Sequence, residues 1–210
     1  KEDNPLIRNR DKIREADYVV MESTYGGRLH KDVKNKGQRF LDIVTETLDK
    51  GGNVIIPSFA VGRTQEILYE IFKNRQTTTD EKYNEKIERL LKTPVYVDSP
   101  LAISATEIFK QNIDIFDEEA QEFIREGQIP IEFPGLKFTK TAEESRELNE
   151  SATQSIIISA SGMCEVGRIK HHLKWNLWRP ECTVLFVGYQ AEGTLGRKLL
   201  NGEKLVKIFG

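Results

Sequence analysis

The sequence predicts an α/β protein with a mostly parallel sheet that is flanked by helices. Two observations lead to this fold class. Short apolar runs rich in Val and Ile, each closed by turn residues, alternate along the chain with longer segments whose apolar residues recur at helical spacing. The runs are also apolar throughout, which is typical of strands buried on both faces of a parallel sheet.

The first expected strand ends at Glu22, where an acid, two hydroxyl residues and a Gly pair replace the apolar run. Open parallel sheets place ligand sites just beyond the carboxyl ends of their strands, so Glu22 stands at a candidate functional position. Without further context, a solvated acid is the simpler interpretation. The complete set of expected strands is residues 18–21, 53–57, 95–97, 136–138, 155–159, 183–187 and 205–209.

Helices are expected between these strands. Apolar residues recur at helical spacing from Phe40 to Leu48, until the Gly pair at 51–52 ends the pattern. Thr141 and Glu144 have the spacing of a capping box and open another helix. The other expected helices are one around 67–72, then 82–92, 101–111, 117–127, 167–178 and a short one ending at 200, with loops at 76–80 and 130–134.

The composition sets limits on location and partners. The chain has 210 residues, 30% charged and 38% hydrophobic, which suits one large or two small globular domains. Its net charge of −2 provides no global positive field, so binding to nucleic acid requires a local basic cluster. Cys164 and Cys182 form neither a metal motif nor a disulfide framework, which favours the cytoplasm. No apolar run approaches the roughly 18 residues of a membrane span.

The two ends of the chain indicate a larger protein. The start lacks an initiator Met and any secretory signal pattern, so we expect the chain to begin inside a longer sequence. The other end stops abruptly on the predicted strand at 205–209.

The loops that follow the expected strands are polar and rich in Gly. Hydroxyl and Gly residues before a helix leave backbone N–H groups at a positive dipole end, which suits phosphate. Arg63 and Arg168 each follow a Gly at a helix start and can add bidentate phosphate contacts. Taken singly, the composition of each loop is explained by the preference of Ser, Thr and Gly for helix caps and turns. Together they indicate an anion or polynucleotide groove, formed by residues 22–26, 57–63, 98–100, 159–163 and 188–194.

Several other kinds of site find no support. No Gly-rich loop matches a phosphate-loop or dinucleotide fingerprint, and no Gly-x-Ser-x-Gly elbow is present. Besides His30, the histidines are His171 and His172, which point about 100° apart on a helix and cannot share a metal. We expect His172 at a helix surface or an interface. From its residues alone, the chain is interpreted as a binding or clamp module without a complete catalytic site.

Two further groups have a structural and a functional interpretation. Trp175 and Trp178 lie three apart on one helix face, and we expect them in the core or in a domain contact before a base-stacking platform. Lys31, Lys34 and Lys36 form a basic cluster beside the Glu22 loop. This cluster is interpreted as a solvated helix start, with contact to RNA phosphates as the alternative.

Three stretches resemble the β-CASP nucleases of the metallo-β-lactamase superfamily, which include the polyadenylation endonuclease and ribonuclease J. They are Met-Glu-Ser-Thr-Tyr-Gly at 21–26, Ile-Pro-Ser-Phe-Ala-Val-Gly-Arg-Thr-Gln-Glu at 56–66, and Ile-Ser-Ala-Ser-Gly-Met at 158–163 with Val-Gly-Tyr-Gln-Ala-Glu-Gly-Thr at 187–194. The resemblance covers nearly the whole chain in the family's order. It implies a β-CASP, Rossmann-like fold with edges of a missing metallo-β-lactamase domain.

The resemblance implies a specific role for Glu22. In the family an acid at the end of an apolar strand defines the β-CASP region, and Glu22 matches it. The implied enzyme hydrolyses RNA with two zinc ions, whose ligands in the family lie outside the segment that this chain matches. Glu22 would then support the site by orienting a histidine from beyond residue 210. We expect the chain alone to bind no zinc and to cut no RNA.

The resemblance also implies a domain division and an RNA path. Residues 1–25 would be an edge of the metallo-β-lactamase domain and a linker, 26–202 the β-CASP domain, and 203–210 a strand returning to the first domain. The implied partners are RNA and the metallo-β-lactamase domain, with no membrane, and a homodimer is compatible with the sequence. From loop position, we expect the RNA path to be lined by Ser58, Arg63, Ser159, Ser161, Gly162, Met163 and Arg168.

Two alternatives to a ribonuclease domain remain. Some members of the family lack metal ligands and act as scaffolds in RNA-processing complexes, so the chain is alternatively part of a non-catalytic subunit. An unrelated nucleotide- or sugar-binding α/β domain is the other. It predicts saturable binding of a mononucleotide, whereas a groove for RNA predicts affinity that grows with oligonucleotide length and falls with salt.

Overall fold

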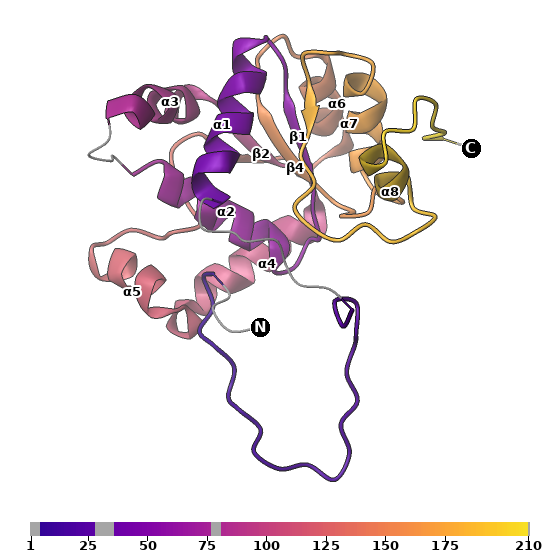
Figure 1. Ribbon diagram of the computed structural model, residues 1–210. Helices are drawn as coiled ribbons and strands as arrows, with labels where there is room; N and C mark the ends of the chain where they lie inside the picture. Colours follow the sequence, from indigo (N-terminus) through magenta and orange to yellow (C-terminus); the bar gives the residue numbers. More distant parts are fainter. Residues whose placement is uncertain (1–4, 28–35, 77–80, 210) are drawn as a thin grey trace.

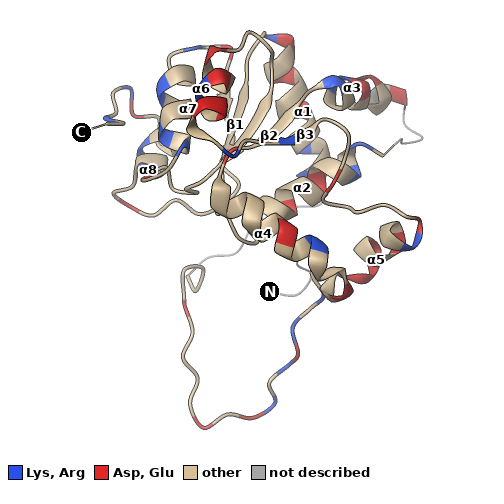
Figure 2. Cartoon of the chain, turned by 180° about the vertical axis from the view of Figure 1, so that it is seen from behind, with Lys and Arg blue, Asp and Glu red and all other residues tan. Residues whose placement is uncertain are grey.

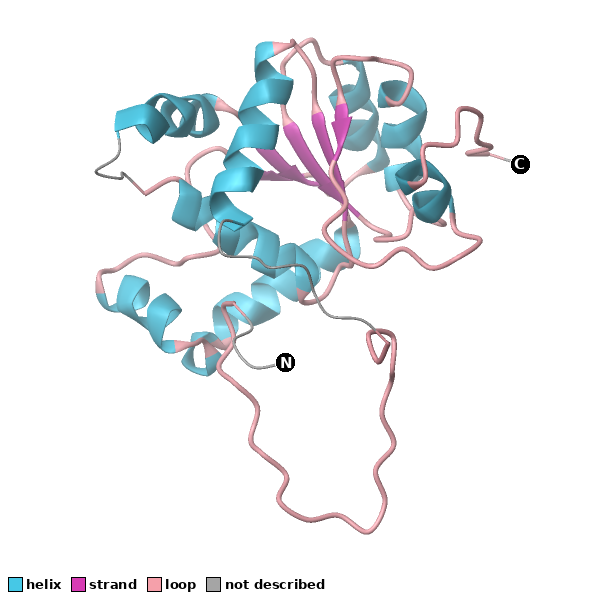
Figure 3. Ribbon diagram, in the orientation of Figure 1, coloured by secondary structure: helices cyan, strands magenta, loops and turns pink. Residues whose placement is uncertain are grey.

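The computed structural model describes residues 5–27, 36–76 and 81–209, and these form an α/β fold (Figures 1 and 3). The elements follow the predicted alternation. In order they are α1 (Lys36–Asp49), β1 (Val54–Pro57), α2 (Arg63–Asn74), α3 (Glu81–Lys92), β2 (Val95–Val97), α4 (Pro100–Gln111), the 3-10 helix η1 (Ile113–Ile115), α5 (Glu118–Arg125), β3 (Leu136–Phe138), α6 (Ala142–Glu150), β4 (Ile156–Ser159), α7 (Ile169–Asn176), β5 (Thr183–Val184) and α8 (Leu195–Leu200).

The sheet has five strands in the order β3-β2-β4-β1-β5, and every neighbouring pair is parallel. In the centre, Ile55 of β1 stands opposite Ile157 of β4, and Val97 of β2 stands opposite Ile158. Each residue of β1 and β4 is buried, as expected for strands covered on both faces. The predicted fold class is therefore confirmed.

The two faces of the sheet carry separate apolar cores. Val54 and Ile56 point into the larger core, to which helices α1 to α5 contribute. Ile55, one residue between them, points into the smaller core formed with α6, α7 and α8. Successive side chains of a strand point to opposite faces, so the same short run serves both layers.

The topology places a switch point between β2 and β4. The chain leaves β2 through α4 and α5 toward β3 on one side, and it leaves β4 through α7 toward β5 on the other. Connections that part in opposite directions from neighbouring parallel strands open a crevice beyond their carboxyl ends. The loops after β2 and β4 lie at this position.

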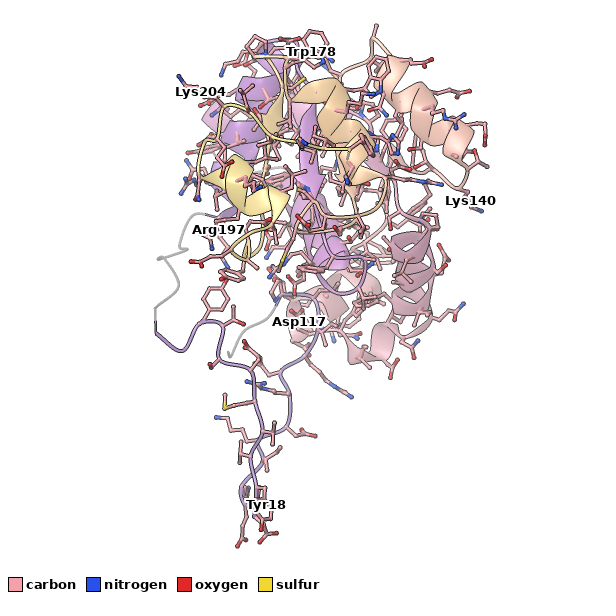
Figure 4. The ribbon with its side chains drawn as sticks, turned by 90° about the vertical axis from the view of Figure 1, so that its right-hand side faces the viewer. Tyr18, Asp117, Lys140, Trp178, Arg197 and Lys204 are labelled. Carbon is pink, nitrogen blue, oxygen red and sulfur yellow. The ribbon has the colours of Figure 1, made fainter. Side chains whose placement is uncertain are left out.

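Two predicted strands are wrong. Tyr18, Val19, Val20 and Met21 form no strand and are highly exposed, in a long loop whose far end at Tyr18 stands away from the body (Figure 4). Residues 205–209 likewise form a loop. A strand requires a hydrogen-bonded neighbour, and within the described residues neither segment lies against an edge of the sheet.

The N-terminal loop is anchored where it joins the body. Leu6 is fully buried, its carbonyl accepts a hydrogen bond from the Asp117 N–H at 2.8 Å, and Ile7 bridges to Phe116. Two members of the predicted basic cluster, Lys31 and Lys34, lie outside the described residues, as does His30. None of the helices in the described ranges is long and apolar enough to cross a membrane.

Candidate nucleic-acid interface

The loops beyond the strand ends are joined into one surface, which we call the strand-end site. It consists of residues 58–63, 98–99, 159–168 and 188–194. The Ser58 N–H donates to the Ser159 carbonyl at 3.0 Å, and the Gln190 side-chain amide donates to the Gly162 carbonyl at 2.9 Å. These bonds connect the loop after β1 to that after β4, and the loop after β4 to that after β5. The predicted convergence of these loops is present.

A buried aspartate, Asp98, lies under the strand-end site. It follows β2 and is fully buried. The Arg168 Nη1 and Thr139 hydroxyl groups donate to its Oδ1 at 2.7 and 2.5 Å, and the Ser145 hydroxyl donates to its Oδ2 at 2.6 Å. His172 Nε2 lies 2.6 Å from the same Oδ2. The guanidinium and the two hydroxyls each offer a hydrogen to the carboxylate, so the geometry fits an ionised Asp98.

The environment of Asp98 sets its pKa. Burial raises the pKa of a carboxyl, but here the hydrogen bonds from His172, Ser145 and Thr139 and the charge of His172 outweigh burial and bring the Asp98 pKa to about 2. On the far side of its ring, His172 Nδ1 lies 2.9 Å from Asn149 Oδ1. Both ring nitrogens thus face oxygen atoms, one of Asp98 and one of Asn149.

Arg168 has a role inside the protein. Its guanidinium contacts Asp98 and also donates to the carbonyls of Thr139 and Lys140, each at 3.0 Å. These bonds hold α7 to the loop that follows β3. The sequence predicted that Arg168 binds phosphate. Most of its donors are engaged within the chain and its side chain is 20% exposed, so that contact stays a prediction.

The loop between β4 and α7 is held in shape by its own groups. The Ser161 hydroxyl accepts hydrogen bonds from the backbone of Glu165 and Val166 at 3.2 and 3.3 Å. At the neck of the loop, Gly167 has a φ of 88°, and a Cβ there would lie 2.4 Å from the Ala160 carbonyl oxygen. Only glycine fits this left-handed, closely packed position.

The predicted contact residues are divided between interior and surface. Ser58 and Ser159 are each 1% exposed, and the Ser159 hydroxyl donates to the Asp98 carbonyl at 2.8 Å. Their hydroxyls therefore lie beneath the surface that we expected them to line, because the loops close over them. Arg63 is 40% exposed and forms an ion pair with Glu66 at 2.5 Å. Of the rest, Gly162 is buried under the Phe59 ring, and Ser161 and Met163 are half-buried.

Glu22 lies in the N-terminal loop, exposed to solvent. Its Oε2 accepts a hydrogen bond from the Thr24 N–H at 2.7 Å, and hydrogen bonding with Thr24 lowers the pKa of its carboxyl. Just beyond it, the Tyr25 ring meets the Tyr189 ring edge-on at 6.1 Å. This contact brings the end of the N-terminal loop to the strand-end site. The predicted role of Glu22 toward a histidine stays a prediction.

The residues in the described ranges do not fit a zinc site. No three His, Cys, Asp or Glu residues among them lie close enough to hold a metal ion. His172 contacts Asp98, whereas the His171 ring lies 4.8 Å from the Phe209 ring, on the outside of α7. We therefore assign no chemical step to a metal bound by this part of the protein.

One sequence prediction about α7 is wrong, and another is narrowed. His172 is fully buried, and it is neither at the surface nor at an interface. Its position one turn from Ile169 and Asn176 places it on the buried stripe, a signal that the sequence carried. Trp175 and Trp178 are 45% and 73% exposed, so they are not in the core, and their contact with another domain stays a prediction.

This architecture defines a class: α/β domains with a polar site at the switch point of a parallel sheet. The chain belongs to the β-CASP family, since the Beta-Casp domain matches residues 64–199, more than half of its length. It is similar to Ribonuclease TTHA0252 of Thermus thermophilus, with 36% identity over 195 residues that cover 93% of this chain and 42% of the relative.

Two archaeal proteins of Methanocaldococcus jannaschii are also similar. The transcription termination factor FttA is 34% identical over 195 residues, covering 90% of this chain and 28% of FttA. The RNase J-like protein is 34% identical over 199 residues, covering 94% and 43%. The chain thus spans less than half the length of these relatives.

Proposed function

We propose that the chain is the RNA-binding β-CASP portion of a zinc-dependent ribonuclease that hydrolyses phosphodiester bonds. The observation that carries this is the strand-end site, four loops joined by hydrogen bonds at the switch point of a β-CASP fold. Relatives named as ribonucleases support the reaction class. The two zinc ions would be held by a metallo-β-lactamase domain beyond these residues. The free cysteines Cys164 and Cys182 are consistent with a cytoplasmic protein.

The residues of the site would have different roles. Arg63 would contact an RNA phosphate, because its guanidinium is the exposed cation at the start of α2. Ser161, Gly162 and Met163 would contact ribose or phosphate from the rigid loop after β4. Ser58, Ser159 and Arg168 would act from below, by holding the loops in place. Glu22 would orient a histidine of the other domain.

Charge reversal at Arg63 tests the groove. We expect Arg63→Glu to weaken binding of single-stranded RNA and to reduce the slope of log affinity against log salt by about 0.7, the value for one lost phosphate contact. The measurement is fluorescence anisotropy of labelled RNA at several salt concentrations, with the full-length protein. Arg125→Glu is the matched control, because Arg125 also pairs with a carboxylate, Glu118 at 2.6 Å, but on α5. Equal affinities for both variants would reject the role of Arg63.

Glu22→Ala in the full-length protein tests the link to catalysis. We expect slower cleavage of RNA with unchanged folding, because Glu22 is fully exposed in this chain and would act only on the other domain. Asp17→Ala, in the same exposed loop, is the control. In parallel, the 210-residue chain alone should neither bind zinc nor cut RNA. Metal-dependent cleavage by that chain contradicts the assignment of zinc ligands to other residues.

A second candidate is a non-catalytic or termination role in an RNA-processing complex, and the similarity to transcription termination factors favours it. In that case the full-length protein would bind RNA and release transcripts without cutting free RNA. A nucleotide-binding domain is distinguished by the ligand, because its affinity for a mononucleotide would match its affinity for a long oligonucleotide.

A further inference from the structure

The outward side of α7 carries a group of residues that the proposed function does not use. Ile169, His172, Leu173 and Asn176 form the buried side of the helix. At 3.6 residues per turn, the remaining positions gather on the opposite side. We call these positions, Lys170, His171, Lys174 and Trp175, together with Trp178 in the turn just after the helix, the α7 outer face.

Aromatic rings are exposed on this face. Trp175, in the last turn of α7, is 45% exposed, and Trp178, two residues beyond the end of the helix, is 73% exposed. The Phe209 ring lies near the lysines of this face, with Lys170 Nζ at 5.0 Å and Lys174 Nζ at 6.0 Å from its centroid. Water-exposed tryptophan rings cost hydrophobic free energy, so exposed rings of this kind mark a surface that another molecule covers.

Charge indicates what that molecule is. The helix segment itself contains no acid. Residues 167–209 carry eight Lys and Arg and three Glu, a net charge of +5, whereas the whole chain has −2. Figure 2 shows blue positions on α7 and α8. The acidic helix α6, which adjoins α7 through the Asn149–His172 contact, bounds the face on one side.

We propose that the α7 outer face binds single-stranded nucleic acid, with bases stacked on Trp175 and Trp178 and phosphates held by Lys170 and Lys174. Proteins that bind single strands without base readout combine these two features, aromatic platforms and a positive surface. The ligand class follows from this surface. That the strand is the RNA bound at the strand-end site rests on the proposed function.

The face extends from the carboxyl ends of the strands, where the strand-end site lies, toward their amino ends. At the start of α7, the Ile169 N–H donates to the Ala160 carbonyl, beside the strand-end site. At the end of α7, Asn176 Oδ1 accepts a hydrogen bond from the side chain of Asn53, which lies just before the amino end of β1. Seven steps of 1.5 Å separate Ile169 from Asn176 by about 10 Å along the helix axis, and Trp178 follows two residues later. In Figure 4, Trp178 stands at the end of the body opposite the N-terminal loop. The strand would therefore continue past the strand-end site along α7.

Trp175 and Trp178 are the two tryptophans of the 210 residues, and their share of the fluorescence of the full-length protein is what a Trp175→Phe/Trp178→Phe variant loses. We expect oligo(U) to quench this share, so the quench should be smaller in the variant than in the wild type. Anisotropy of labelled oligo(U) gives the affinity. Trp178→Ala should raise the Kd about 5- to 150-fold, as expected for one lost base stack. Trp178→Phe should restore most of the affinity, since a phenyl ring also stacks.

The charged half of the face is tested by Lys174→Glu, which should weaken binding and flatten its salt dependence. Lys92→Glu is the control, because Lys92 is an exposed lysine on α3, away from α7 (Figure 1). Unchanged affinity in both Trp178→Ala and Lys174→Glu overturns the proposal. The proposal is also overturned if the wild-type protein self-associates and Trp178→Ala makes it monomeric, because the face would then bind a second copy of the protein. If Arg63→Glu loses RNA binding while the substitutions on the α7 outer face leave the affinity unchanged, the proposed function stands and only this inference is rejected.

Discussion

Asp98→Ala is expected to lower the free energy of unfolding by about 3–5 kcal/mol, the cost of removing one partner from a buried charge network. The substitution leaves the Arg168 guanidinium and the His172 ring without their carboxylate, and the hydroxyls of Thr139 and Ser145 without an acceptor. These groups belong to α6, α7 and the loop after β3. The loss therefore loosens the whole layer beneath the strand-end site, and RNA affinity should fall with stability.

Urea denaturation followed by circular dichroism measures this loss. Asp117→Ala is the matched control, because Asp117 caps α5 by accepting from the Ala120 N–H at 2.8 Å and its removal should cost only about 1 kcal/mol. A loss at Asp98 no larger than that at Asp117 would mean that the network contributes little.

The same carboxylate predicts a pH dependence. The Asp98 pKa is about 2 in the folded chain, against the ordinary 3.8 that the unfolded chain retains. The unfolded state thus binds the proton first as pH falls. The stability from Asp98 is complete above about pH 5 and is lost as pH falls toward 2, by about 2 kcal/mol in total. Denaturation midpoints between about pH 6 and 2 should show this slope in the wild type and a reduced slope in Asp98→Asn.

The sheet was predictable where strands are buried on both faces. Residues 54–57 and 156–159 are apolar runs closed by turn residues, and each became a central strand. The run at 183–187 became only Thr183–Val184, because β5 is an edge strand that pairs with two residues of β1. The run at 18–21 is also apolar throughout, but it has no neighbouring strand among the described residues. Composition indicates which segments can pair, and pairing itself depends on the rest of the fold.

The sequence predicted where the site lies in the fold, but it did not predict which side chains of the site are buried. Parallel strands bring their carboxyl ends to one edge, so the loops after β1, β4 and β5 had to meet. Whether a hydroxyl such as that of Ser159 lies on the surface or beneath it depends on how those loops fold over each other. The pairing of Asp98 with His172 joins residues 74 positions apart, and no local pattern indicates such a partner. The predicted role of Glu22 rests on family resemblance and not on its own surroundings.

Gly167→Ala is the other substitution with a large expected effect, because this glycine forms the neck of the loop after β4. A side chain at a φ of 88° costs about 1–2 kcal/mol. The new Cβ would also lie 2.4 Å from the Ala160 carbonyl oxygen, a backbone atom that itself accepts from the Ile169 N–H. The neck must widen, and we expect a total loss of about 3 kcal/mol, strain and displaced packing together.

Gly202→Ala separates these two costs. Gly202 has a φ of 77°, but an added methyl group would find nothing within 4 Å, so this variant should lose only the backbone strain of a left-handed residue, about 1–2 kcal/mol. Widening the neck also moves Ser161, Gly162 and Met163, which are proposed to contact RNA, whereas Gly202 lies beyond α8. Gly167→Ala should therefore lower both stability and RNA affinity, and Gly202→Ala stability alone. Equal RNA affinity in the two variants, measured where both are folded, would show that the shape of this loop does not determine binding.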